Sequence, residues 1–160
     1  MDYIRLLPKN TLSRFVGDLA CLEEPKWLVD RTKAWFIKTY NLDMNAAEKS
    51  LSDYKSLQDL FTRKLKPGLR PIGQGLVHPC DAQLTQSRPI EDSQLLQAKG
   101  ITYSLKEFLK DPTAEQTFKQ GAQLTYYLCP TDYHRVHSPV EGQIEQVIHV
   151  PGELWPVNPW

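Results

Sequence analysis

The sequence contains few cysteines, and their spacing excludes two common classes of small protein. Three cysteines occur in 160 residues, at positions 21, 80 and 129, and no two of them form a CxxC pair. The sequence therefore indicates neither a disulfide framework nor a cysteine zinc site. A reducing compartment fits this cysteine usage best.

Long hydrophobic runs are also missing. No apolar stretch approaches the 18 residues that a bilayer-spanning helix needs, and the residues after Arg5 lack the apolar core of a signal peptide. We therefore expect any contact with a membrane to be peripheral.

The charge is balanced overall but unevenly distributed. Residues 1–70 hold 13 basic and 9 acidic side chains, whereas residues 71–160 hold 6 and 10. The basic half suits either an anionic membrane surface or an ordinary solvated helical face. A hydrophobic content of 41% is typical of a globular chain and excludes wholesale disorder. We expect no nucleic-acid partner.

The first 66 residues carry helical patterns. Leu12, Phe15, Val16, Leu19 and Leu22 recur at the spacing of one helix face.

Two further helices are predicted in this region. One opens at Glu24-Pro25 and carries tryptophans among lysines and arginines; a polar connector follows over 41–55. Ser56 is a predicted N-terminal cap for the other helix, and Pro67-Gly68 ends the helical region.

Beyond residue 70, short apolar runs alternate with turn residues, as is typical of strands. The predicted strands are 76–78, 83–85, 95–98, 124–129 and 143–150. A helix is predicted after Ser104, because Ser104 and Glu107 have the spacing of a capping box. The predicted fold class is α+β: a helical, membrane-associating arm over 1–66 and a mainly antiparallel, β-rich catalytic body over 67–160.

A cluster of titratable side chains lies between Pro130 and Pro139. It contains His134 and His137, three residues apart, in a segment predicted to be a loop that leaves a strand. If this loop is extended, the two imidazoles point in opposite directions. Three interpretations remain open: structural histidines, a metal site with His78 and His149, or acid–base catalysis with an orienting carboxylate such as Asp81.

Four ordered blocks resemble one enzyme family. The stretch LCPTDYHRVHSP at 128–139, followed by Gly142, is similar to the histidine motif of phosphatidylserine decarboxylases. The blocks VPGEL at 150–154 with Val157-Asn158, LQAKG at 96–100 with YSL at 103–105, and FTRKL at 61–65 with RPI at 70–72 support the same resemblance. Together they cover nearly all of residues 10–158.

The resemblance implies a pyruvoyl-dependent lyase that converts phosphatidylserine to phosphatidylethanolamine and carbon dioxide. In this family a proenzyme cuts itself at a serine, which becomes the pyruvoyl group of a C-terminal small subunit and acts as the electron sink. Asp81 and His137 match the acid and the histidine that activate this serine. His134 matches the histidine linked to decarboxylation through proton handling.

The chain departs from the family pattern at two points. Ala82 stands where the family commonly has glycine after the acid, which predicts a changed turn beside Asp81. The chain also contains no Gly-Ser dipeptide, so the pyruvoyl-forming serine is absent from it. We therefore expect a truncated N-terminal portion with an incomplete β body, unpaired strand edges and no activity alone.

The implied partners are phosphatidylserine, an anionic membrane surface and the C-terminal pyruvoyl-bearing small subunit. A homodimer is a further state that the resemblance leaves open. The implied location is the cytoplasmic face of the cell membrane, as a peripheral protein. The alternative function is a noncatalytic remnant that binds a membrane surface through its helical arm.

Overall fold

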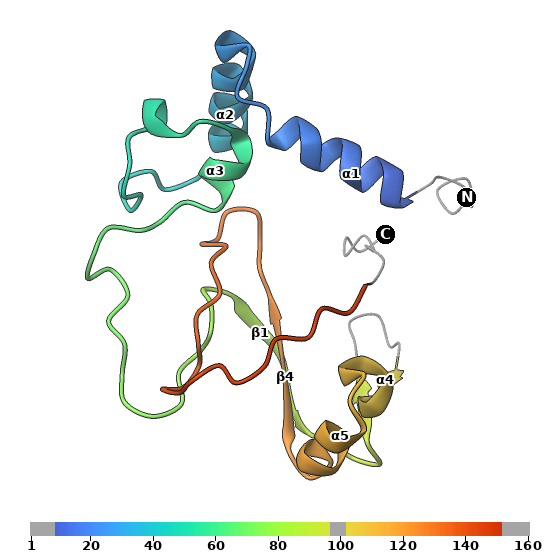
Figure 1. The fold of residues 1–160 in the computed structure, drawn as a ribbon. Coiled ribbons are helices and arrows are strands. Elements are labelled where there is room, and N and C mark those ends of the chain that lie inside the picture. Colours follow the sequence, from blue (N-terminus) through green and yellow to red (C-terminus); the bar gives the residue numbers. More distant parts are fainter. Residues whose placement is uncertain (1–8, 97–101, 152–160) are drawn as a thin grey trace. The chain divides into compact units, whose positions relative to one another are not determined.

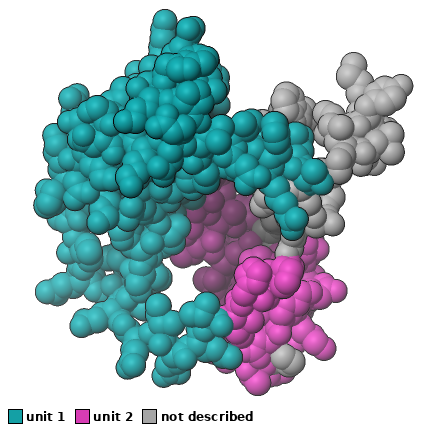
Figure 2. Space-filling view, turned by 45° about the horizontal axis from the view of Figure 1, so that its top comes forward, with its two compact units in different colours: residues 1–82, 128–147, 153–155 teal, residues 83–127, 148–152, 156–160 magenta. Residues whose placement is uncertain are grey.

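The chain folds as a mixed α+β protein, which confirms the predicted class (Figure 1). The computed structural model describes residues 9–96 and 102–151. Within them, one compact unit contains residues 9–82 and 128–147, and a second contains 83–96, 102–127 and 148–151 (Figure 2). The proposed functional division at residues 66 and 67 stays a prediction.

Two helices open the larger unit. Helix α1 spans Lys9–Ala20 and ends two residues before Leu22, which the periodicity had included. Helix α2 spans Lys26–Tyr40 and ends where Asn41 adopts a left-handed conformation and donates its N–H to the Ile37 carbonyl. Both predicted helices are confirmed, and neither they nor any other helix in the described ranges has the length and apolarity to cross a bilayer.

The two helices differ in how much of their apolar surface they bury. On α2, Phe36 joins a core with Leu42, Tyr54 and Leu60, which is fully buried. The predicted face of α1 is instead 49–58% exposed at its four large apolar side chains, Leu12, Phe15, Val16 and Leu19. Burial therefore anchors α2 within the unit, whereas the apolar stripe of α1 faces solvent.

The predicted cap at Ser56 is confirmed. Helix α3 spans Leu57–Phe61, and the Ser56 hydroxyl accepts the Asp59 N–H at 3.1 Å. The connector before it contains a short 3₁₀ turn, η2, at Leu51–Asp53. This turn and Tyr54, which follows it, are held to α2 by a buried cation, Lys33.

Lys33 is 2% exposed, and its ammonium group has three oxygen partners. It donates to the Tyr54 carbonyl at 2.6 Å and to the Leu51 carbonyl at 3.3 Å, and it pairs with Asp30 at 2.9 Å. These bonds compensate a buried charge that would otherwise be costly. They also fix the turn that brings α3 back against α2.

The smaller unit contains two antiparallel pairs of strands. Strand β1, Gln83–Pro89, pairs with β4, Ala122–Tyr127, with an irregularity between Leu84 and Gln86. Strand β2, Gln94–Leu96, pairs with β3, Thr102–Ser104. The β region is thus two small ladders rather than one sheet.

Two short helices complete this unit. Helix α4, Leu105–Leu109, begins at the predicted capping box, since Ser104 accepts the Glu107 N–H at 3.1 Å and its hydroxyl donates to that carboxylate at 2.8 Å. The hydrogen bond from the Ser104 hydroxyl is the main cause of a lowered Glu107 pKa. Helix α5, Pro112–Phe118, was not predicted, although Asp111 caps it and Pro112 opens it.

The strand predictions succeed only in part. Residues 76–78 and 143–150 are irregular, because no described strand pairs with them, and Ile144 and Val147 are more than 80% exposed. The strand predicted at 124–129 lies two residues earlier, and the one predicted at 83–85 extends to Pro89. Of the strand predicted at 95–98, residues 97 and 98 lie outside the described residues.

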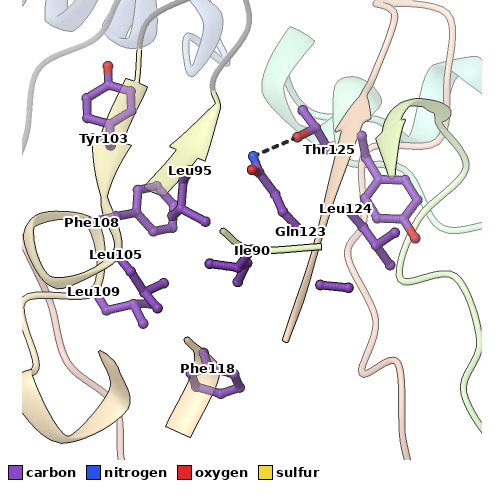
Figure 3. A pocket seen from close by; sticks show the side chains of 12 residues that line it. Ile90, Leu95, Tyr103, Leu105, Phe108, Leu109, Phe118, Gln123, Leu124 and Thr125 are labelled. Carbon is purple, nitrogen blue, oxygen red and sulfur yellow. Dashed lines mark hydrogen bonds between the residues drawn. The ribbon is translucent and has the colours of Figure 1, made fainter. Parts of the chain in front are cut away.

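An apolar cavity of about 460 Å³ lies in the smaller unit (Figure 3). Its walls come from the strands and from α4 and α5, and Leu105, Phe108 and Phe118 lie among them. Among the described residues, no histidine, cysteine or carboxylate lines it, so the described walls lack the groups that most often act in acid–base catalysis.

Lys33→Met is expected to lower the free energy of unfolding of the larger unit by about 1–3 kcal/mol. The apolar substitute fills the space but leaves the Tyr54 and Leu51 carbonyls without their donor. Urea unfolding followed by tryptophan fluorescence measures the change. Lys38→Met, at an exposed position on the same helix, is the matched control; equal stability of the two variants would contradict this account of Lys33.

Candidate functional site

The histidine segment is an irregular loop that directly follows β4, as predicted. A tight turn opens it: the Asp132 N–H donates to the Cys129 carbonyl at 2.9 Å, and the Asp132 carboxylate accepts the Cys129 N–H at 2.6 Å. This turn directs the chain into the larger unit. Residues 131–139 are called the histidine loop below.

The C-terminal end of α3 anchors the histidine loop. The Arg63 guanidinium donates through Nη2 to the carbonyls of Thr131 and Asp132, at 3.1 and 3.3 Å. The Arg135 Nε donates to the Thr62 carbonyl at 2.8 Å. Arg63, at the helix end, thus binds the loop, and Arg135, in the loop, binds the helix end.

Arg63 is unusual because it is 4% exposed. Burial lowers its pKa, against the opposing influence of Tyr54, Asp43 and Asp132. Within the described residues, its Nε and Nη1 atoms are buried without a hydrogen-bond partner. The described partners of the guanidinium are backbone carbonyls, and both carbonyls belong to the histidine loop.

The two histidines have different surroundings, as the extended-loop alternative predicted. The His134 ring stacks on Phe61 with centroids 4.0 Å apart, and its Nε2 donates to the Cys129 carbonyl at 2.9 Å. Since a carbonyl only accepts, this bond places the His134 proton on Nε2. His134 is thereby fixed against α3.

His137 lies in a pocket instead. Its backbone N–H donates to the Pro79 carbonyl at 2.7 Å, which joins the loop to the segment just before Asp81. Its ring stacks on Tyr133 with centroids 5.5 Å apart, and its Nε2 lies 3.0 Å from the Tyr133 hydroxyl. Tyr133 is 9% exposed, so its ring is packed inside the unit and offers His137 a fixed partner.

Asp81 has a different partner from the one predicted. Its carboxylate accepts from the Arg70 Nε at 2.7 Å and also contacts Arg70 Nη2. This hydrogen bond is the main cause of a raised Arg70 pKa. Within the described residues no hydrogen bond joins Asp81 to His137, so the two halves of the predicted pair occupy one pocket without touching. Ala82 is not among the described residues with a positive φ, so its methyl group adds no backbone strain.

The pocket has a volume of about 540 Å³ and belongs entirely to the larger unit. Asp81, His137, Tyr133 and Arg70 line it, together with Lys64, Leu65, Lys66, Gly68, Pro71, Ile72, Gly73, Val77, His78, Pro79, Cys80, Arg135 and Ser138. Burial, followed by the charges of Asp81 and Asp132, raises the pKa of the Cys80 thiol. His134 does not line this pocket.

Comparison with known proteins decides the family. The family model for phosphatidylserine decarboxylase matches residues 57–160. The chain belongs to the phosphatidylserine decarboxylase family. The match begins at α3 and includes the histidine loop and every residue that lines the pocket.

Individual relatives cover almost the whole chain. A phosphatidylserine decarboxylase proenzyme of Shewanella sp. (strain W3-18-1) is 45% identical over 96% of this chain and 55% of that protein. Those of Vibrio parahaemolyticus and Myxococcus xanthus are 45% and 43% identical, over 99% of this chain and 59% and 58% of theirs. The chain therefore spans a little over half the length of these relatives.

The sequence singled out Asp81, His134 and His137 as candidate site residues, and their roles stay predictions; it gave no sign of the partners that the structure places beside them. Arg70 and Arg63 lie in the blocks that carried the resemblance, yet nothing in their spacing connects them to Asp81 or to the histidine loop. A metal centre was an open alternative for the histidines. Within the described residues, no three side chains of His, Cys, Asp or Glu come together as a metal site requires.

Tyr133→Phe is expected to change the environment of His137 alone. The substitution preserves the stacked ring but removes the hydroxyl 3.0 Å from His137 Nε2. The ¹⁵N chemical shift of His137 Nε2 should move, whereas His134 Nε2, bound to the Cys129 carbonyl, should keep its shift. Heteronuclear NMR of the ring nitrogens measures both in one sample. Equal shifts at the two histidines, or none at His137, would contradict the contact.

Proposed function

We propose that this chain is the large-subunit portion of a phosphatidylserine decarboxylase, a carboxy-lyase that releases carbon dioxide from phosphatidylserine to give phosphatidylethanolamine. The observation that carries the proposal is that Asp81 and His137 line one pocket in a chain that belongs to this family. The curated relatives are named proenzymes, which supports a processed second subunit. We therefore propose that activity requires a C-terminal segment bearing the cleavage-site serine.

His137 is the proposed base for that serine. Its backbone is fixed to Pro79 and its ring to Tyr133, so the imidazole is oriented before any partner arrives. An imidazole can accept the proton of a hydroxyl when a carboxylate holds its other nitrogen. Asp81 is the carboxylate available, on the segment to which His137 is bonded.

Asp81 and His137 must first leave their present partners before they can bind each other. Asp81 is held by Arg70 and His137 by Tyr133, so a direct bond between them requires Asp81 to leave the guanidinium. Both members of the Arg70–Asp81 pair are partly exposed, at 55% and 31%. Solvent screens such a pair, so its loss costs little. We propose that binding of the C-terminal segment drives this exchange.

The residues of the pocket fit a pyruvoyl group. Such a group would supply the electron sink for loss of the carboxylate. The chain contributes an imidazole, a carboxylate and cationic side chains, which can hold a carbonyl and move a proton beside it. His134 is the proposed proton-handling residue for the decarboxylation step, positioned by its stack on Phe61.

Co-expression with the C-terminal half of a relative tests the proposal. The chain and the C-terminal half of the Shewanella relative should associate, cleave at the serine and release carbon dioxide from phosphatidylserine. His137→Ala should abolish cleavage and gas release, because no base remains for the hydroxyl. Mass spectrometry of the small subunit and a decarboxylase assay provide the two readouts.

His149→Ala is the matched control, since that imidazole is exposed and does not line the pocket. Association without cleavage in the parent chain would point to a disabled site. In that case the noncatalytic membrane-binding function would become the better account.

We also propose that α1 and the exposed tryptophans of α2 place the protein on an anionic membrane, on its cytoplasmic face. The exposed apolar side chains of α1 support this, as do Trp27 and Trp35, which are 65% and 58% exposed. Lysines and arginines accompany them on both helices. An apolar face flanked by cations is typical of a helix that lies in a membrane interface.

Phe15→Gln with Leu19→Gln is expected to weaken binding to phosphatidylserine vesicles by roughly tenfold or more, because two apolar side chains no longer enter the interface. Vesicle co-sedimentation measures the partition coefficient. Thr11→Gln, exposed on the same helix, is the control. Unchanged binding of the double variant would remove α1 from the anchoring surface.

A further inference from the structure

We infer that Lys64, Lys66 and Arg70 form a subsite for the phosphate group of an anionic glycerophospholipid, with the apolar wall beside them receiving the glycerol and the first carbons of its chains. The inference rests on the proposed function and assigns residues outside the acid–histidine pair to substrate binding.

The pocket is strongly cationic. Four permanent cations line it, Lys64, Lys66, Arg70 and Arg135, against the single carboxylate of Asp81. Arg135 is already bound to the Thr62 carbonyl, and Arg70 is paired with Asp81. In the described part of the chain, neither Lys64 nor Lys66 has an ion-pair partner. Two ammonium groups are thus available for an anion.

The backbone places both lysines on one side of an extended segment. The Lys64 carbonyl accepts the Glu48 N–H at 2.9 Å, and the Lys66 N–H donates to the Ala46 carbonyl at 2.9 Å. Arg63 is buried and Leu65 half-buried, whereas Lys64 and Lys66 are exposed. This alternation directs the two ammonium groups outward together, because every second side chain of an extended strand shares a face.

The apolar part of the lining distinguishes a lipid from a free anion. Leu65, Pro71, Ile72, Val77 and Pro79 share the pocket with the cations. Ile72 is 82% exposed, an unfavourable position for a large apolar side chain in water. Cationic and apolar surfaces side by side match a phosphodiester that continues into a glycerol and acyl chains. A solvated lysine face would explain the charges but not the apolar wall.

The subsite also lies beside the residues proposed for catalysis. Arg70 bonds directly to Asp81, and Asp81 and His137 line the same pocket. A phosphate that binds Arg70 competes with Asp81 for the guanidinium. Substrate binding would therefore keep Asp81 away from Arg70 after the C-terminal segment has driven the partner exchange.

Titration of the 160-residue chain with soluble ligands tests the subsite without any cleavage or decarboxylation. The probes are dihexanoyl phosphatidylserine below its micelle concentration, glycerophosphoserine and inorganic phosphate, followed by calorimetry and by the backbone resonances of residues 64–72. Dihexanoyl phosphatidylserine should bind most tightly. Lys64→Ala with Lys66→Ala should weaken it by roughly thirtyfold, since each of the two cations near an anionic lipid contributes about 1 kcal/mol.

Lys64→Arg with Lys66→Arg should retain binding, and Lys38→Ala, an exposed lysine on α2, should leave it unchanged. Equal affinity for inorganic phosphate would overturn the lipid assignment. Equal affinity of the Ala double variant and the parent chain would overturn the subsite. Because these measurements involve no second subunit, their failure is distinguishable from a failure of the co-expressed halves to cleave.

Discussion

The buried guanidinium of Arg63 connects the two parts of the larger unit on which the candidate site depends. It joins the end of α3 to carbonyls 68 and 69 residues further along the chain. The carbonyls come from the turn that precedes both histidines, so the position of each imidazole follows from this contact. Burying a charged group with unpaired N–H groups is costly, and such costs are tolerated where a specific geometry must be kept. Phe61 and Thr62 reinforce the same junction through His134 and Arg135.

The two histidines differ in their surroundings and in the roles proposed for them. His134 faces α3, with its tautomer fixed by a carbonyl, whereas His137 faces the pocket beside the segment that carries Asp81. Arg70 can hold either the Asp81 carboxylate or an anionic ligand, so the two compete for its guanidinium. In the proposed sequence of events, the C-terminal segment first releases Asp81 from Arg70, and an anionic ligand then takes its place on the guanidinium.

The sequence predicted those features that depend on local chemistry. The caps at Ser56 and Ser104 were found because a hydroxyl and a following acidic residue have a fixed spacing in a helix start. The loop character of residues 131–139 followed from the prolines that bracket it. The α1 periodicity correctly predicted a helix, but a periodic stripe does not reveal whether the chain itself buries it.

Features that depend on distant partners were not predictable in this way. The apolar alternation of residues 143–150 resembles a strand, yet a strand forms only where another pairs with it. The Arg70–Asp81 pair and the Arg63 cross-link are contacts between segments whose approach no spacing encodes. The resemblance selected Asp81 and His137, and the structure added that each has a different partner in this chain.

The central claim is that Asp81 exchanges Arg70 for His137 when the site is assembled. The most direct measurement is a crystal structure of the chain in complex with the C-terminal half of the Shewanella relative. The account predicts an Asp81 carboxylate within hydrogen-bond distance of the His137 ring, about 2.6–3.2 Å, and an Arg70 side chain released from it. A complex that has cleaved its serine while Asp81 is still paired with Arg70 would contradict the account.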